Sequence, residues 1–303
     1  MSSTSMSTTG HPIEVRGLVK VFGSLRALDG IDLSVERGAV HGFLGPNGAG
    51  KSTAIRVLLG LYRATSGQVR VLGRDPNKHP AEVTRRLSYV PGDVALWPNL
   101  TGQQALDVLA GLRGDRDEPA ERELLERFSL DPTKRIRSYS TGNRRKVLLV
   151  AGFAAPTELL ILDEPTAGLD PLMERIFQQC VEEAAARGRT VLLSSHVLSE
   201  VERLCTDVTI IKDGRVVESG SLHDLRHLAA VEISVRADRP TLQGLGAALP
   251  GAQLDDERLS ISVDRGDLPE TLARVARSGA TDVTVASASL EDLFLRHYRT
   301  GAR

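Results

Sequence analysis

Cysteine and long apolar runs are both scarce in this chain. Its 303 residues include two cysteines, Cys180 and Cys205, which lie far apart and lack C-x-x-C spacing. A disulfide framework is therefore excluded, and the pair is typical of reduced core thiols in a cytosolic protein. The most apolar run, residues 147–155, is much shorter than the ~20 apolar residues of a membrane span. We therefore expect no membrane-spanning helix.

The chain also lacks an excess of charge of either sign. Its 38 lysines and arginines balance 39 aspartates and glutamates, for a formal net charge of −1. Domains held to nucleic acid by bulk electrostatics are usually clearly basic, so we expect no nucleic-acid partner. The start of the chain is rich in Ser, Thr and Met and has neither a positive end nor an apolar stretch, so it is no secretory signal. We expect a disordered tail over residues 1–12 of a cytoplasmic protein.

What the sequence does contain is an alternation of short strand patterns with longer helical patterns, which favours an α/β fold. Two runs without polar alternation, residues 159–162 and 190–194, are typical of parallel strands covered on both faces. The tail of the chain keeps the alternation but lacks the motifs described below. We predict a main domain over residues 13–227 with a helical subdomain near residues 93–155, and a small α/β domain over residues 228–303.

The individual elements follow from apolar periodicity and from turn residues at their ends. Asp213-Gly214 between two strand patterns predicts a hairpin. Strands are predicted over residues 31–35, 40–44, 67–72, 87–91, 159–162, 190–194, 208–211, 215–218, 231–235, 259–263 and 281–286. Helices are predicted over residues 52–61, 100–111, 118–128, 143–155, 172–187, 240–248, 268–277 and 289–298.

A glycine-rich segment separates a predicted strand from a predicted helix and fits the pattern G-x-x-x-x-G-K-[ST]. Such glycines let consecutive backbone N–H groups surround phosphate oxygens, and the positive end of the following helix adds to the attraction. The alternative is a chance glycine-rich turn, which the flanking strand and helix disfavour. We expect Lys51 to reach the β and γ phosphates and Ser52 to ligate magnesium. The predicted nucleotide-binding residues are Gly45, Pro46, Asn47, Gly48, Ala49, Gly50, Lys51, Ser52 and Thr53.

Polar residues end the two buried strand patterns. Asp163 can hold magnesium through water, and Glu164 can polarise the attacking water as a general base. His196 follows the next strand and can sense the γ-phosphate and orient that water. Taken alone, the acidic pair would be a solvated turn and the histidine a polar strand end, but the phosphate-loop motif favours function. We predict Glu164, His196 and Lys51 as catalytic residues, with ATP and Mg²⁺ as cofactors.

The order of these motifs resembles the ATP-binding subunit of an ABC transporter, over about residues 13–227. Residues 139–143, Tyr-Ser-Thr-Gly-Asn, resemble the family signature Leu-Ser-Gly-Gly-Gln, and residues 167–170, Ala-Gly-Leu-Asp, match its D-loop. The resemblance implies a P-loop NTPase fold with an ABC-type β-subdomain and a helical subdomain. It further implies a homodimer in which the signature of one copy binds the ATP held by the other. The residues so implied are Ser140, Thr141, Gly142, Asp170 in the link between the two sites, and Phe22, which would stack on adenine or otherwise belong to the core.

The sequence departs from the family pattern at two places. Thr141 replaces a signature glycine and adds bulk where the backbone should approach phosphate. The glutamine expected after Tyr89-Val90-Pro91 is replaced by Gly92 and Asp93. In the family that glutamine contacts magnesium and couples the nucleotide to the membrane partner. Asp93 is a candidate for a water-mediated magnesium ligand in its place.

Two segments indicate a membrane subunit as the partner and the kind of transporter to which the chain is similar. Trp97 lies in a proline-containing loop where the family docks a helix of its membrane subunit, and it is either a partner anchor or a buried residue. Residues 289–295 resemble the tail of bacterial drug and antibiotic exporter subunits.

The resemblance implies an ATPase that dimerises around two ATP molecules and drives export of a small molecule, a drug or antibiotic, through a separate transmembrane permease. Such a subunit is cytoplasmic and peripheral on the inner face of the membrane. The alternative is a soluble ABC ATPase acting on ribosomes or DNA, which the single nucleotide module and the lack of sustained heptads disfavour. A degenerate module that binds ATP without hydrolysing it is disfavoured by Glu164 and His196.

Overall fold

The computed structural model describes residues 10–228, 231–255, 257–263, 266–280 and 282–287. Most of the predicted N-terminal tail and the whole predicted helix over residues 289–298 lie outside these residues. The chain divides into two compact units, Met1–Gly220 and Ser221–Arg303. The predicted bounds of the functional domains, 13–227 and 228–303, stay predictions. Within the described part of the chain, every helix falls short of the length and apolarity needed to cross a bilayer.

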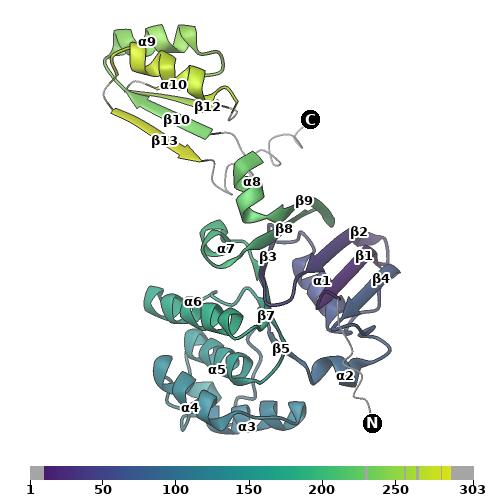
Figure 1. The fold of residues 1–303 in the computed structure, drawn as a ribbon. Helices are drawn as coiled ribbons and strands as arrows, with labels where there is room; N and C mark the ends of the chain where they lie inside the picture. Colours follow the sequence, from purple (N-terminus) through teal and green to yellow (C-terminus); the bar gives the residue numbers. More distant parts are fainter. Residues whose placement is uncertain (1–9, 229–230, 256, 264–265, 281, 288–303) are drawn as a thin grey trace, which may run out of the picture. The chain divides into compact units, whose positions relative to one another are not determined.

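The larger unit is built on a six-stranded sheet with the order β5-β6-β7-β3-β8-β9 (Figure 1). Neighbouring strands from β5 to β8 are parallel. The three strands β3, β6 and β7 are buried at every position, as their apolar runs predict. This sheet confirms the predicted α/β class. The strands are β3 (Val40–Leu44), β5 (Leu87–Val90), β6 (Leu159–Asp163), β7 (Thr190–Ser195), β8 (Asp207–Lys212) and β9 (Arg215–Ser221).

The turn from β8 to β9 is the predicted hairpin. Asp213 and Gly214 have φ of 49° and 75°. Positive φ at both central residues suits the right-handed twist of two paired strands.

An antiparallel sheet with the order β2-β1-β4 lies beside the six-stranded sheet. Its strands are β1 (Ile13–Phe22), β2 (Leu25–Val35) and β4 (Ser66–Val71). A single core cluster joins the two sheets through the helix α1 (Lys51–Leu58). Its members include Ile13, Leu28, Phe43, Ile55 and Ile161, each fully buried.

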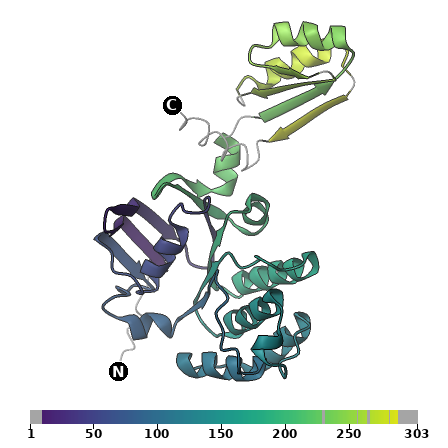
Figure 2. The same ribbon diagram turned by 180° about the vertical axis from the view of Figure 1, so that it is seen from behind.

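The larger unit has further helices, several of which pack directly on the six-stranded sheet. These further helices are α2 (Pro80–Thr84), α3 (Gly102–Arg113), α4 (Glu118–Arg127), α5 (Thr141–Ala154), α6 (Pro171–Ala186) and α7 (Leu198–Leu204), with a 3₁₀ turn at Ile136–Ser138. Helices α3, α4 and α5 gather on the side of the unit away from β1, β2 and β4 (Figures 1 and 2). Helix α3 starts with a capping box, in which Thr101 and Gln104 each accept a bond from the other's backbone N–H.

The smaller unit begins with α8 (Leu222–Leu228) and continues as a layer of helices on an antiparallel sheet of order β11-β12-β10-β13. The chain order β-α-β-β-α-β with this strand order is the ferredoxin-like arrangement. Its core includes Ile233, Val235, Leu245 and Leu259. The elements are β10 (Val231–Arg236), α9 (Arg239–Ala248), β11 (Gln253–Asp255), β12 (Arg258–Val263), α10 (Leu268–Arg277) and β13 (Asp282–Ser287).

Candidate nucleotide-binding site

The glycine-rich loop connects β3 to α1, as predicted. Gly48 and Gly50 have φ of 82° and 108°. A Cβ on Gly50 would lie 2.7 Å from Leu28 Cδ2 and 2.9 Å from the Ala27 carbonyl oxygen, so only glycine fits there. Gly50 is also the N-cap of α1 and offers no side-chain acceptor. The first amides of α1 are therefore available to an anion such as phosphate.

Lys51 is a buried cation at the mouth of this loop. Its side chain is 5% exposed. The Nζ atom donates to the carbonyl oxygens of Gly45 and Pro46, at 2.5 and 3.2 Å, and lies 3.2 Å from Glu164 Oε1. The ammonium group is thus held between the phosphate loop and the end of β6.

Asp163, at the end of β6, is the buried carboxylate nearest the loop. Its Oδ1 atom accepts a hydrogen bond of 2.6 Å from Ser194 Oγ, and a longer one of 3.5 Å from Ser52 Oγ. The parallel pairing of β6 with β7 places Asp163 beside Ser194. A hydroxyl and a carboxylate oxygen that converge in this way are ligands that suit Mg²⁺. The predicted pair, Ser52 and Asp163, is therefore brought together.

Glu164 has an unusual backbone conformation. Its φ is 49°, in the left-handed region that costs a residue with a Cβ about 1 kcal/mol. Its N–H donates to the Ser194 carbonyl oxygen at 3.0 Å. The carboxylate contacts Lys51 and accepts a hydrogen bond from Nδ1 of His196. An ionised carboxylate can only accept, so with Glu164 in that form the His196 tautomer that makes this bond carries its proton on Nδ1.

A second buried carboxylate supports the histidine turn. Glu200, in α7, is 6% exposed and accepts a hydrogen bond of 2.6 Å from Ser195 Oγ. Burial raises the pKa of Glu200. Glu200 was not predicted from the sequence, although a glutamate four positions after His196 at the start of a helix was a usable signal.

One cleft collects most of the predicted residues. Its walls are the phosphate loop, the start of α1, the segment after β5 and the end of β6. Tyr89, which was not predicted, also lines it, and burial raises the pKa of Tyr89 to about 12. The predicted residues that line the cleft are Pro46, Asn47, Gly48, Gly50, Lys51, Ser52, Thr53, Asp93, Asp163 and Glu164.

Phe22 lies outside the residues that line this cleft. Its ring is 39% exposed and packs edge-on against Tyr62, with ring centroids 5.3 Å apart. Lys20 Nζ lies 4.6 Å from the Phe22 centroid. The contacts of Phe22 with Tyr62 and Lys20 were not predicted from the sequence, and the stacking of Phe22 on adenine stays a prediction.

The signature residues do not join the cleft of their own chain. Ser140 is the N-cap of α5 and accepts a bond of 3.2 Å from the Asn143 N–H. A Cβ on Gly142 would lie 3.0 Å from the Gly168 carbonyl oxygen, so the signature and the D-loop adjoin within one chain. Asp170 caps α6 and accepts from two backbone N–H groups. Ser140, Thr141, Gly142 and Asp170 all lie outside the cleft lining.

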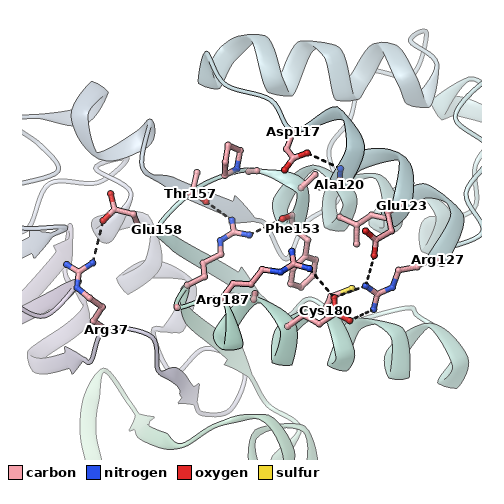
Figure 3. Close-up of a pocket in the computed structure, with 18 residues that line it drawn as sticks. Arg37, Asp117, Ala120, Glu123, Arg127, Phe153, Thr157, Glu158, Cys180 and Arg187 are labelled. Atoms are coloured by element: carbon pink, nitrogen blue, oxygen red, sulfur yellow. Dashed lines mark hydrogen bonds and ion pairs between the residues drawn. The ribbon is translucent and has the colours of Figure 1, made fainter.

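A separate cavity of about 410 Å³ lies between α4, the end of α5 and α6 (Figure 3). Arg127 crosses it to form two hydrogen bonds, of 2.8 and 2.9 Å, with Glu183. Burial raises the pKa of the Cys180 thiol at its wall to about 12. This cavity shares no lining residue with the nucleotide cleft.

The fold and the cleft define a P-loop ATPase. Residues 28–167 match the family model described as ABC transporter. Daunorubicin resistance ATP-binding protein DrrA3 of Streptomyces coeruleorubidus is 36% identical over 299 residues, which cover 93% of this chain and 94% of that protein. The chain belongs to the ABC transporter family, as an ATP-binding subunit, and is an ATPase.

Other relatives agree with this assignment. Bacitracin transport ATP-binding protein BcrA of Bacillus licheniformis is 37% identical over 212 residues, 68% of each chain. The solved structure of an ATP-binding subunit of an ABC transporter has a TM-score of 0.67 and 32% identity, and covers 71% of this chain and 91% of that one. The dimeric cassette MJ0796, at 20% identity and a TM-score of 0.63, shares the fold over 69% of this chain and 98% of its own.

Proposed function

We propose that two copies of this chain close around two ATP molecules and drive export of a small molecule, a drug or antibiotic, through a separate transmembrane permease. The observation that carries the dimer is the position of the signature. Ser140 and Thr141 are exposed at the start of α5 and do not line the cleft that contains Lys51. This position supports a second copy that brings these groups to the nucleotide.

The cleft residues divide the chemistry of hydrolysis among them. The amides of the glycine-rich loop and Lys51 bind the phosphates. Ser52 and Asp163 would hold Mg²⁺, with Asp93 as a further ligand through water, and the ion would offset phosphate charge. Glu164 takes a proton from the attacking water, and His196, bonded to Glu164, orients it.

The partner copy contributes the rest of the site. The Ser140 hydroxyl and the first amides of α5 bind the γ-phosphate, and Gly142 allows close approach. Asp170 connects the two sites through its cap on α6.

Phe22 packs against adenine. The domain bounds 13–227 and 228–303 complete this proposal.

The transport half of the proposal rests on relatives and on one exposed residue. DrrA3 is named for daunorubicin resistance and BcrA for bacitracin transport. Trp97 is 44% exposed, which supports the partner-anchor interpretation over a buried one. A chain with this role lies on the inner face of the cytoplasmic membrane.

A complementation experiment tests the shared site. Lys51→Ala removes the phosphate loop's cation, and Ser140→Ala removes the signature hydroxyl, so each variant alone should hydrolyse ATP at background rate. An equimolar mixture should recover about a quarter of wild-type activity, because half of the dimers are mixed and each of these has one intact site. A mixture that stays at background contradicts the proposed dimer.

A second experiment tests the partner. A tagged full-length chain purified from solubilised membranes should retain a membrane protein, and cells that express both should lose accumulated drug. Stable copurification with ribosomes instead would support the soluble ABC ATPase.

A further inference from the structure

A buried arginine joins the signature helix to the wall of the nucleotide cleft. Arg145 lies in α5 and is 3% exposed. Its Nη1 atom donates to the Pro91 carbonyl oxygen at 2.7 Å, and Nη2 donates to the Gly92 carbonyl oxygen at 2.5 Å. Pro91 and Gly92 line the cleft, whereas Arg145 lies behind them. One side chain therefore holds two consecutive peptide groups of the cleft wall.

The segment that Arg145 holds lies directly against the predicted magnesium ligand. Strand β5 pairs with β6, so that Val90 lies beside Leu162. A Cβ on Gly92 would lie 3.3 Å from the Asp163 carbonyl oxygen and 3.7 Å from Asp163 Oδ2. A methyl group at Gly92 would thus touch both the backbone and the carboxylate of Asp163. The Gly92 backbone therefore lies next to Asp163, close enough for a change in its position to alter the surroundings of that carboxylate.

The charge of Arg145 is costly at this position. A buried ion needs compensating hydrogen bonds, and an apolar side chain of similar volume often packs without loss of stability. Burial lowers the pKa of Arg145, while Asp163, Asp93 and Glu164 favour its charged form. Packing alone therefore does not account for a guanidinium here. What this group provides is a rigid planar fork in which two separate nitrogen atoms each bind one carbonyl, whereas a lysine ammonium is a single nitrogen on a flexible stem.

We propose that Arg145 is a positioning residue that couples the signature helix to the magnesium side of the cleft. It acts at the segment where the family pattern has a glutamine and this chain has Gly92 and Asp93. The inference rests on the proposed function, in which the start of α5 meets the nucleotide of a second copy. When α5 shifts as it meets the nucleotide, the two hydrogen bonds of Arg145 move the Pro91 and Gly92 backbone with it. The movement of Gly92 then alters the surroundings of Asp163.

The opposite end of the same helix offers a matched control. Arg189 donates to the Gly152 and Phe153 carbonyl oxygens at 2.9 and 3.0 Å, and to Thr157 Oγ1 at 2.5 Å. Burial lowers the pKa of Arg189 to about 10. Phe153 and Thr157 line the separate cavity in Figure 3. Arg189, which lies between α6 and β7, thus binds carbonyl groups of α5 with the same guanidinium chemistry, away from the nucleotide cleft.

The test compares Arg145→Lys with Arg189→Lys in the full-length chain, with Mg²⁺ and ATP varied independently and unfolding measured for each variant. Arg145→Lys should lower kcat about tenfold and raise the half-saturating Mg²⁺ concentration about fivefold, with KM for ATP changed less than about twofold. Arg189→Lys should lower the unfolding midpoint but leave kcat and the Mg²⁺ requirement unchanged. Equal effects of both variants on kcat, or an Arg145→Lys effect on stability alone, would overturn the proposal.

A double-mutant cycle keeps the inference testable if Arg145→Lys also weakens folding. Gly92→Ala adds a methyl group against Asp163. If Arg145 acts through Gly92, the effects of the two substitutions on kcat should be non-multiplicative by at least about threefold. Multiplicative effects would overturn the coupling. A wild-type chain without Mg²⁺-dependent hydrolysis would instead contradict the proposed function, so the two failures are distinguishable.

Discussion

The two units of this chain place their polar side chains differently. In the larger unit, strands β3, β6 and β7 are buried throughout, and the predicted catalytic residues come at or after their carboxyl ends. In the smaller unit, Glu232 and Arg236 of β10 are exposed, whereas the other four residues of that strand are buried. Both units are α/β, and among the described residues it is the larger unit that brings the predicted catalytic groups to one edge of its sheet.

Strand direction accounts for this difference. The carboxyl ends of parallel strands meet at one edge of the sheet, where loops from several strands form a cleft. Antiparallel strands send alternate ends to opposite edges, and their polar residues lie along one face instead. Substitutions at the edge of the parallel sheet should therefore change activity more than stability, and core substitutions in the smaller unit should do the reverse.

The largest effect is expected for Glu164→Gln. The amide cannot take a proton from water, so turnover should fall about a thousandfold. ATP binding and the unfolding midpoint should stay near the wild-type values, because Glu164 is a cleft residue and not a core one. Phosphate release and calorimetry of nucleotide binding measure the two quantities. Hydrolysis at the wild-type rate would refute the general-base role.

The reverse behaviour is expected for Ile233→Ala in the smaller unit. Ile233 is fully buried in the core of that unit, and its truncation should cost about 3 kcal/mol of unfolding free energy. ATP hydrolysis at a temperature where the variant is folded should be unchanged. Urea unfolding and phosphate release on the same preparation test this. A parallel loss of activity would show that the two units are not independent.

A pH effect should come from His41, a buried histidine near the start of the parallel strand β3. Burial lowers the pKa of His41 to about 4, against the opposing charge of Asp207. Below about pH 6.5 the unfolded chain gains a proton that the folded chain does not, so His41 lowers the unfolding free energy as pH falls toward 4, by up to about 3 kcal/mol. Unfolding at pH 7 and pH 5 measures the loss.

The His41→Gln variant is the control for this prediction. It keeps a hydrogen-bonding group for Thr209, which lies 2.9 Å from His41 Nε2, but does not titrate. Its stability should depend less on pH over the same range. An unchanged pH dependence would assign the effect to other groups.

The smallest effect is expected for Val285→Ala. Val285 in β13 pairs with Ile233 across the same sheet, but it is 47% exposed. Its truncation should change the unfolding free energy by about 0.5 kcal/mol or less. A cost close to that of Ile233→Ala would show that β13 is covered by another surface in solution.

Many elements could be predicted from the sequence because local pattern and tertiary role agree there. Helix α10 has the predicted bounds, 268–277, and β3 the predicted bounds 40–44. The predicted strand over residues 31–35 was shorter than β2. The first residues of β2 belong to the strand because they pair with β1, as far as the pair Phe22 and Leu25. The three residues of β11 are all exposed and gave no apolar pattern.

The contacts within the site were less accessible from the sequence. Lys51, Asp163 and Glu164 were predicted from motif chemistry, and the cleft brings them together. Arg145 was visible only as a basic residue at the start of an apolar helix, since nothing local shows that it meets the Pro91 and Gly92 carbonyls.

By itself the sequence determined the family, the ATPase chemistry and the phosphate loop, because these depend on residue types at fixed local spacings. Only the tertiary structure decided which groups face one another. Segments that are distant in the sequence form the Glu164–His196 hydrogen bond and the hydrogen bonds of Arg145 to the cleft wall. They also decide that Ser140 does not line the cleft of its own chain. The order of strands in a sheet sets those distances, and no local pattern encodes that order.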